Sequence, residues 1–256
     1  TDLMPREIAP LGRALNQLME RLDALLANQR RLLADAAHQL NTPLAAIRLQ
    51  GQIARRATGP GRAAALDELD RGIVRVGNVV SQLLQLARLE PEAMQPEFTQ
   101  VPLDELVTQT VIEFSDRASA QGIDLGLTHC DHATVWGDTH SLRDLLDNLV
   151  DNALRYCPRG TRVDLELRSG ERSVSLEVID SGPGIAPADR ARVLERFVRL
   201  DHSQTQGSGL GLSIVDRIVK LHGGILELRS APAGGLWVHV ELPAWRAPEP
   251  ADTAAT

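Results

Sequence analysis

Three side chains near the middle of this 256-residue sequence have types and spacing that suit cation and anion chemistry. Asn148 and Asn152 stand four residues apart in DNLVDNALRY, and Arg155 follows three residues later. In a helix these positions share one face, so two amide oxygens and a guanidinium lie together. Amide oxygens suit Mg²⁺, which keeps several waters and bridges to substrate phosphates. The alternative is that both asparagines are ordinary solvent-facing residues.

Two glycine-rich segments follow the asparagines. Asp180 opens DSGPG at 180–184, where a carboxylate can accept from an amine and the glycines let a planar ligand approach the backbone. Gly207, Gly209 and Gly211 stand directly before a helical pattern, an arrangement in which free N–H groups receive phosphate. The GxGxG spacing excludes a Rossmann fingerprint, and no GxxxxGK[ST] motif occurs. Taken alone, DSGPG is equally consistent with an ordinary turn.

A single histidine interrupts an apolar helical pattern in the first part of the chain. In LLADAAHQLNTPLAAIR, residues 32–48, His38 is followed five positions later by Pro43. A neutral imidazole can attack a phosphoryl group with one nitrogen while a neighbour holds its other N–H. Alone, such a residue is more often a polar group on the solvent side of a coiled coil. The glycine and asparagine motifs downstream reverse that preference.

Two long helical patterns must position the histidine. Apolar residues recur at alternating steps of four and three from Leu11 to Leu25, which is typical of a coiled-coil seam. Glycines and a proline in ATGPGR, residues 57–62, predict a turn, and a second helical pattern runs on to LEPEAMQPE. We therefore expect an antiparallel helical hairpin over residues 27–92. Its apolar stripe predicts packing against a second copy, as a homodimeric four-helix bundle.

Residues 93–244 change to a mixed pattern of helices and alternating strands. We expect helices at 103–122, 140–157, about 190–194 and 210–222, and strands at 123–129, 133–137, 161–168, 173–180, 224–230 and 235–243. The fold class is thus α plus α/β. Residues 245–256 are rich in Pro, Ala and Thr, and we expect them to be disordered.

Composition excludes several classes of protein. A formal net charge of −7, with no basic block, argues against a nucleic-acid partner. Cys130 and Cys157 lack ligand spacing, which argues against a disulfide framework and structural zinc and favours a reducing compartment. Because helical heptads begin directly after an initial Thr, we expect the sequence to be a fragment of a longer protein.

The motifs together resemble a known family. DNLVDNALRY, DSGPG, ERFVRLD and GSGLGL occur in the order of the N, G1, F and G2 boxes of the sensor histidine kinases, and HQLNTPLAAI resembles their H box. The resemblance implies a HAMP-distal linker at 1–26, a dimerisation and phosphotransfer hairpin at 27–92, and an ATP-binding domain at 93–244. That domain would be an α/β sandwich of the Bergerat type, which the family shares with gyrase, Hsp90 and MutL.

The resemblance also implies a site for Mg²⁺ and ATP. Asn152, supported by Asn148, matches the Mg²⁺ ligand, and Asp180 matches the carboxylate that binds the adenine amine. A mobile ATP lid would run roughly from residue 186 to 208. The residues that the resemblance places around the nucleotide are Asn148, Asn152, Arg155, Tyr156, Asp180, Gly182, Gly184, Phe197, Gly207, Gly209, Leu210, Gly211 and Leu212.

Around the histidine, the sequence departs from the commonest H box. His38 matches the phosphoacceptor, and Thr42 matches the position that orients water when the response regulator is dephosphorylated. Many members carry an acidic residue where this chain has Gln39 and a basic one where it has Asn41. Gln39 can form hydrogen bonds but cannot take up a proton, so the imidazole proton would leave to water. Because some members share His-Gln-Leu, kinase activity stays the expectation.

The function implied is autophosphorylation of His38 from Mg·ATP and transfer to an aspartate of a response regulator, with phosphatase activity as well. The chain would be the cytoplasmic portion of a bacterial inner-membrane protein that is anchored through segments outside this sequence. Two alternatives stay open. A conformational ATPase would need a glutamate where this chain has Asn148, preceded by Asp147. A phosphatase-only dimeric scaffold is suggested by Gln39.

Pro43 suggests a hinge beside the phosphoacceptor. It removes the N–H that would bond the carbonyl of Gln39, which loosens the helix next to His38. We therefore expect Pro43→Ala to stiffen this helix and to change the ratio of autokinase to phosphatase activity. Both activities can be measured on radiolabelled phosphoprotein, and an unchanged ratio would contradict the hinge.

Overall fold

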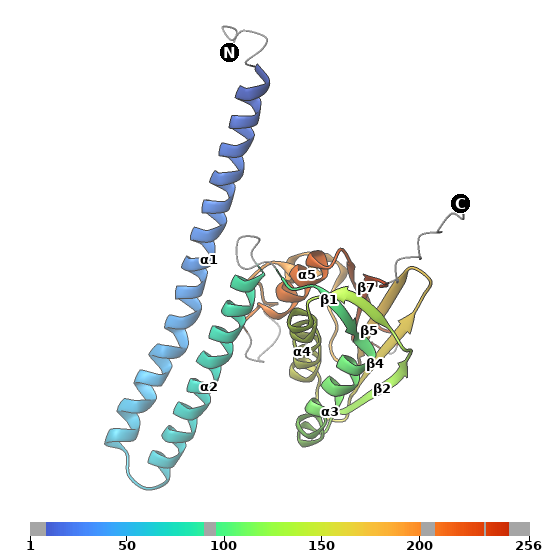
Figure 1. The fold of residues 1–256 in the computed structure, drawn as a ribbon. Coiled ribbons are helices and arrows are strands. Elements are labelled where there is room, and N and C mark those ends of the chain that lie inside the picture. Colours follow the sequence, from blue (N-terminus) through green and yellow to red (C-terminus); the bar gives the residue numbers. More distant parts are fainter. Residues whose placement is uncertain (1–8, 90–95, 201–207, 233, 246–256) are drawn as a thin grey trace, which may run out of the picture. The chain divides into compact units, whose positions relative to one another are not determined.

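The computed structural model describes residues 9–89, 96–200, 208–232 and 234–245, and Figure 1 shows the ribbon. The side chains of several residues in the first helix, His38 and Gln39 among them, lie outside this description. The chain divides into two compact units, Thr1–Leu83 and Leu84–Thr256. The described part of the chain contains no helix that is long and apolar enough to cross a membrane.

The first unit is a helical hairpin, as the sequence predicts. Helix α1 spans Ala9–Arg56 and runs unbroken through Pro43, and helix α2 spans Pro60–Arg88 (Figure 1). Gly59 has a positive φ of 59° and accepts the N–H of Arg62, which forms the turn between the helices. Pro60 is the first residue of α2, a position where its missing N–H costs nothing.

A row of large apolar side chains lies exposed along this hairpin. At Gly72 the two helices approach so closely that a Cβ would lie 2.8 Å from Cγ1 of Ile47. One hairpin nevertheless leaves much apolar surface in contact with solvent, and Leu18 is 62% exposed. The exposed residues are Leu15, Leu18, Met19, Leu22, Leu26, Leu44, Leu49, Ile53, Leu66, Ile73, Val74 and Val80. This surface is what the expected second copy would cover.

The second unit is a five-stranded sheet with helices packed against one face (Figure 1). The strand order is β2-β4-β5-β7-β6, in which β2 and β4 are parallel and the other neighbours antiparallel. Helices α3, α4 and α5 contact β2, β5 and β6 respectively. The bounds are α3 Leu103–Gln121, α4 Thr139–Tyr156, α5 Gly211–Leu221, β2 Asp124–Cys130, β4 Arg162–Ser169, β5 Ser173–Asp180, β6 Ile225–Ser230 and β7 Leu236–Pro243. The expected α/β sandwich is confirmed.

The structure differs from the sequence analysis in two local elements. A strand that the sequence analysis missed, β1 (Thr99–Pro102), pairs antiparallel with β3 (Thr134–Gly137). It has only four residues and ends in proline, so its alternation is too short to detect. The helix expected near 190–194 is instead two 3₁₀ turns, Pro187–Asp189 and Arg192–Leu194. Beyond β7, the N–H of Trp245 still bonds to Thr134, and residues 246–256 lie outside the described residues.

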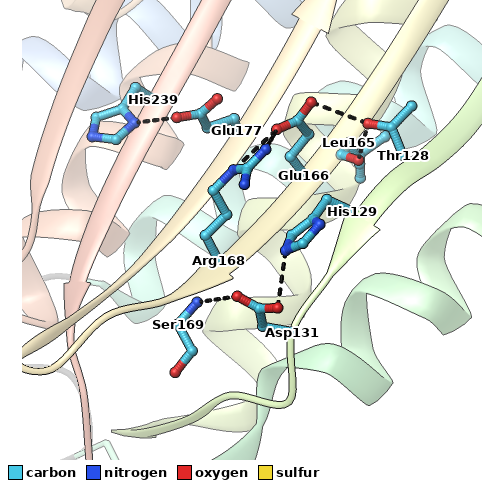
Figure 2. Close-up of polar contacts among 9 residues, drawn as sticks. All are labelled: Thr128, His129, Asp131, Leu165, Glu166, Arg168, Ser169, Glu177 and His239. Carbon is cyan, nitrogen blue, oxygen red and sulfur yellow. Dashed lines mark hydrogen bonds and ion pairs between the residues drawn. The ribbon is translucent and has the colours of Figure 1, made fainter.

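The face of the sheet opposite the helices is polar, and Figure 2 shows its central contacts. His129, Glu166, Glu177 and His239 stand opposite one another in turn across β2, β4, β5 and β7. Glu166 and Glu177 are directly opposite each other, and two like charges in such positions destabilise a sheet. Each of these glutamates, however, has its own cationic or hydrogen-bonding neighbour. Arg168 lies 2.7 Å from Glu166, and Nδ1 of His239 lies 3.2 Å from Glu177 (Figure 2).

A buried histidine connects the end of α5 to the beginning of α4. His222 is only 7% exposed, and its ring stacks on Phe98 with centroids 5.0 Å apart. Its Nε2 accepts the N–H of Asp138 at 3.1 Å, so the proton is on Nδ1, which donates to Ile218 O at 2.8 Å. Asp138 caps α4, because its carboxylate accepts the N–H of Ser141. His222 thereby anchors the helix that carries the two asparagines.

Acid should weaken the fold through His222. Burial lowers the pKa of His222, against the opposing effect of its bond to Ile218. Folding therefore favours the neutral imidazole. The contribution of His222 to the free energy of unfolding is complete above the unfolded pKa of about 6.5, and it is lost as the pH falls through the lower pKa of the folded state. We expect urea midpoints to drop between pH 7.5 and 5 more steeply in the wild type than in His222→Gln. Because a buried hydrogen bond of His222 is lost when its ring is protonated, the free energy of unfolding should fall by about 1–3 kcal/mol.

The exposed His132 supplies the matched control. Its side chain is 82% exposed, so solvent screens its contact with Asp104 and His132→Gln should keep the wild-type pH slope. Equal slopes in the wild type and His222→Gln would show that His222 does not set the acid response.

Candidate functional site

Helix α4 brings both asparagines to the start of α5. Asn148 is 7% exposed and donates through Nδ2 to Asp144 O at 2.7 Å, so the solvent-facing alternative is wrong for this residue. A Cβ on Gly211 would lie 3.4 Å from Asn148 Oδ1, which shows how closely the first residue of α5 packs on α4. Asn152 lies one turn further on and is half-buried. The helical spacing places it on the same face of α4 as Asn148.

Asp180 ends β5 with a carboxylate held by backbone. Its Oδ1 accepts the N–H of Gly182 at 2.8 Å and that of Leu236 at 3.0 Å. Burial raises the pKa of Asp180, and these two N–H bonds oppose that rise. Because both bonds go to Oδ1, Oδ2 can accept a hydrogen bond from a ligand amine.

Glycines allow three backbone segments to meet at this carboxylate. Gly235 has a φ of 96°, and a Cβ there would lie 2.0 Å from Asp180 O. Gly184 has a φ of 69°, and its Cβ would lie 2.8 Å from Gly235 O. Sequence reasoning found Gly182 and Gly184 but missed Gly235. The adjacent glycines at 234 and 235 signal a tight turn, but nothing in the sequence indicates which strand end the turn contacts.

Cys157 lies against Gly182 in the DSGPG turn, a contact that sequence reasoning also missed. A Cβ on Gly182 would lie 3.2 Å from the Cys157 sulfur. Burial, with a further contribution from the charge of Asp180, raises the pKa of Cys157 to about 11. The thiol is therefore neutral and unreactive at physiological pH. Tyr156 precedes it at the end of α4 and is half-buried.

The F and G2 motifs meet at the base of the expected lid. The N–H of Phe197 donates to Gly209 O at 2.9 Å, and both residues have positive φ, 63° and 73°. A Cβ on Gly209 would lie 2.8 Å from Phe197 C and Val198 O, so only glycine fits. Leu210 and Leu212 are buried beside it. Gly207 lies outside the described residues.

Leu210 is the N-cap residue of α5 and provides no side-chain hydrogen bond to the first turn. The backbone N–H groups of that turn are therefore suited to an anionic ligand. This supports the expectation that the G2 segment receives phosphate.

Arg155 and Asp147 add charge along α4. Arg155 forms an ion pair with Asp151. Asp147 has one buried carboxylate oxygen, Oδ1, without a hydrogen-bond partner among the described residues. Burial raises the pKa of Asp147 to about 6, partly offset by the nearby charge of Arg143.

The residues of the H box lie in the middle of α1. His38 and Gln39 are part of the helix, and their side chains are outside the described part. Thr42 is exposed one turn later. The structure does not place this unit against the second, so the approach of His38 to the nucleotide stays a prediction.

Gly209 offers a test of the lid base, with Gly223 as its matched control. Both have positive φ, 73° and 67°, but a Cβ on Gly223 meets nothing within 4 Å. Alanine should cost both sites backbone strain, of order 1 kcal/mol, and only Gly209→Ala should also displace Phe197. We expect Gly209→Ala to weaken binding of a fluorescent ATP analogue at least tenfold, and Gly223→Ala to change it less than twofold. Equal losses of affinity in both variants would contradict a role of the Phe197–Gly209 contact in nucleotide binding.

Two family models match the chain. One, described as "His Kinase A (phospho-acceptor) domain", matches residues 28–92. The other, described as "Histidine kinase-, DNA gyrase B-, and HSP90-like ATPase", matches residues 137–246. The first range contains His38 and Thr42, and the second contains the asparagine, Asp180 and glycine-rich motifs.

Named relatives agree with both models. Sensor protein QseC of Escherichia coli (strain K12) is 39% identical over 91% of this chain and 51% of its own length. Sensor protein kinase PmrB of Pseudomonas aeruginosa is 38% identical over 94% of this chain and 51% of its own. A solved structure of the mycobacterial sensor histidine kinase MprB is 33% identical, with a TM-score of 0.52, over 57% of this chain and 97% of that one. This chain thus spans about half the length of these curated relatives, and it belongs to the family of two-component sensor histidine kinases.

Proposed function

We propose that this chain autophosphorylates His38 from Mg·ATP and transfers the phosphoryl group to an aspartate of a response regulator, with phosphatase activity toward that regulator. It would act as a homodimer through the helical hairpin, as the cytoplasmic portion of a bacterial inner-membrane protein. The observation that carries the proposal is the carboxylate of Asp180, whose Oδ1 is held by two backbone N–H groups. That arrangement presents the other oxygen to an adenine amine.

The remaining pocket residues suit the rest of the nucleotide. Tyr156 and Cys157 would line the adenine end beside Gly182 and Gly184. Phosphates would lie at the first turn of α5, near Gly211, where the backbone N–H groups favour anions. Arg155 would contact phosphate from α4.

A Mg²⁺ ion would fit the amide oxygens of α4. The described residues include no cluster of three His, Cys, Asp or Glu that could hold a metal ion. Asn152, supported by the buried Asn148, would therefore share the ion with phosphate oxygens and water, as Mg²⁺ prefers. The bound ion would neutralise charge on the transferring group.

The transfer itself requires a neutral imidazole. One nitrogen of His38 would attack the γ-phosphorus in line, the bond to the ADP oxygen would break, and a phosphohistidine would form. Gln39 cannot accept the proton that leaves the ring, so that proton would pass to water. Thr42 would orient water in the opposing dephosphorylation of the regulator.

One observation keeps a conformational ATPase as the second candidate. Asp147 stands directly before Asn148 on α4, and burial raises its pKa to about 6, near the range of a general base. Its charged neighbours Arg143 and Glu113 lie on the α3–α4 side. A water-activating role for Asp147 would release free phosphate without forming a phosphoprotein.

Labelling with γ-radiolabelled ATP tests the proposed function. The wild type should become labelled in acid-labile form, and His38→Gln should lose all labelling while keeping its ATP affinity. Asp180→Asn should lose both, because its amide cannot replace the carboxylate toward an amine. Equal labelling of the wild type and His38→Gln would refute the assignment of His38. Steady phosphate release without labelling would favour the ATPase.

A further inference from the structure

Three charged side chains join α3 to the C-terminal end of α4. Asp151 lies between two arginines: its Oδ1 is 2.7 Å from Nη1 of Arg117, and its Oδ2 is 2.5 Å from Nη2 of Arg155. The side chains of Asp151 and Arg155 are 25% and 23% exposed, so solvent screens this contact only in part. Each carboxylate oxygen therefore has its own guanidinium.

We propose that Asp151 holds Arg155 away from the nucleotide until phosphate displaces it, and that Arg117 sets the strength of that hold. Arg155 would thus exchange one anionic partner for another when ATP binds. Arg117 and Asp151 are positioning residues in this scheme, because neither needs to touch the nucleotide. The inference rests on the proposed function, in which Arg155 contacts phosphate.

Helix geometry places Arg155 between two possible partners. It lies four residues after Asp151 and three residues after Asn152, and both spacings bring side chains together on a helix. Long side chains in a helix point back toward its N-terminus, so Arg155 can reach either position. In the described structure it is paired with Asp151. A phosphate held beside Asn152 would compete for the same guanidinium.

Arg117 allows Arg155 to leave Asp151 without leaving the Asp151 carboxylate uncompensated. When Arg155 moves to phosphate, Asp151 keeps Arg117, so no partly buried carboxylate is left uncompensated. Arg117 is itself held over the ring of Phe114, with its guanidinium carbon 5.8 Å from the centroid. This contact lies within α3 and is independent of any nucleotide.

The charges give the two positioning residues opposite effects on ATP affinity. Without Arg117, Asp151 would bind Arg155 more strongly and add an unscreened negative charge near the triphosphate. Without the carboxylate of Asp151, phosphate would have one anionic competitor fewer for the guanidinium of Arg155. A merely structural role predicts a loss of affinity in both variants, so the sign of the change decides between the two.

The test is isothermal titration of the full chain with a non-hydrolysable ATP analogue plus Mg²⁺, and separately with adenosine. Arg117→Gln should weaken binding of the analogue about threefold to tenfold, and Asp151→Asn should tighten it by a similar factor, as expected for partly exposed charge pairs. Arg117→Lys should stay near the wild type. Adenosine carries no phosphate, so its affinity should be the same in all variants.

The double variant Arg117→Gln/Asp151→Asn should behave like Asp151→Asn, because Arg117 acts only through that carboxylate. Arg143→Ala is the matched control, since Arg143 also crosses from α4 to α3, where it pairs with Glu113, and makes no contact with Asp151. It should leave the affinity of the ATP analogue unchanged.

Weaker binding of the analogue by Asp151→Asn would overturn the inference, as would equal changes for adenosine and the analogue. If the wild type binds the analogue and the variants match it, the exchange is wrong while the proposed function stands. If the wild type binds neither ligand, the proposed function itself fails and the exchange fails with it. Thermal midpoints of all variants show whether each is folded.

Discussion

The geometry of the second unit at the end of β5 depends on the hydrogen bonds to the half-buried carboxylate of Asp180. Removing a carboxylate from water is costly unless hydrogen bonds replace its hydration. Here the N–H groups of Gly182 and Leu236 replace that hydration. Gly182 lies in the turn that follows β5, and Leu236 is the first residue of β7. Because both donors are backbone, the two segments must lie within hydrogen-bonding distance of Asp180. Gly235 follows from this constraint, since any side chain there would collide with the Asp180 backbone.

Close backbone approach is also required at the start of α5. Gly211 begins α5 directly against Asn148, and Gly209 lies on the backbone of Phe197. His222, at the far end of α5, holds the N-cap of α4. The two ends of α5 thereby contact α4 at its N-cap and at Asn148, and Asn152 follows one helical turn after Asn148.

Sequence reasoning found the functional motifs because each has a strong local signal. The asparagine pair, DSGPG and the glycines before α5 combine helical or strand periodicity with turn chemistry, and both are local properties. The helical hairpin and most strands were predictable for the same reason. Strand β1 was missed because four residues carry too little periodicity. The two 3₁₀ turns were taken for one helix because so short a segment does not distinguish a 3₁₀ turn from an α-helical one.

The sequence by itself determined the order of the longer helices and strands, the family motifs and the residue types available for phosphoryl transfer. Only the tertiary structure decided which distant groups meet: Leu236 and Gly235 at Asp180, Cys157 at Gly182, and Arg117 at Asp151. These contacts join residues that are far apart along the chain, and no local spacing encodes them. They arise because the sheet order places β5 beside β7 and the packing of α3 on α4 brings their charged faces together.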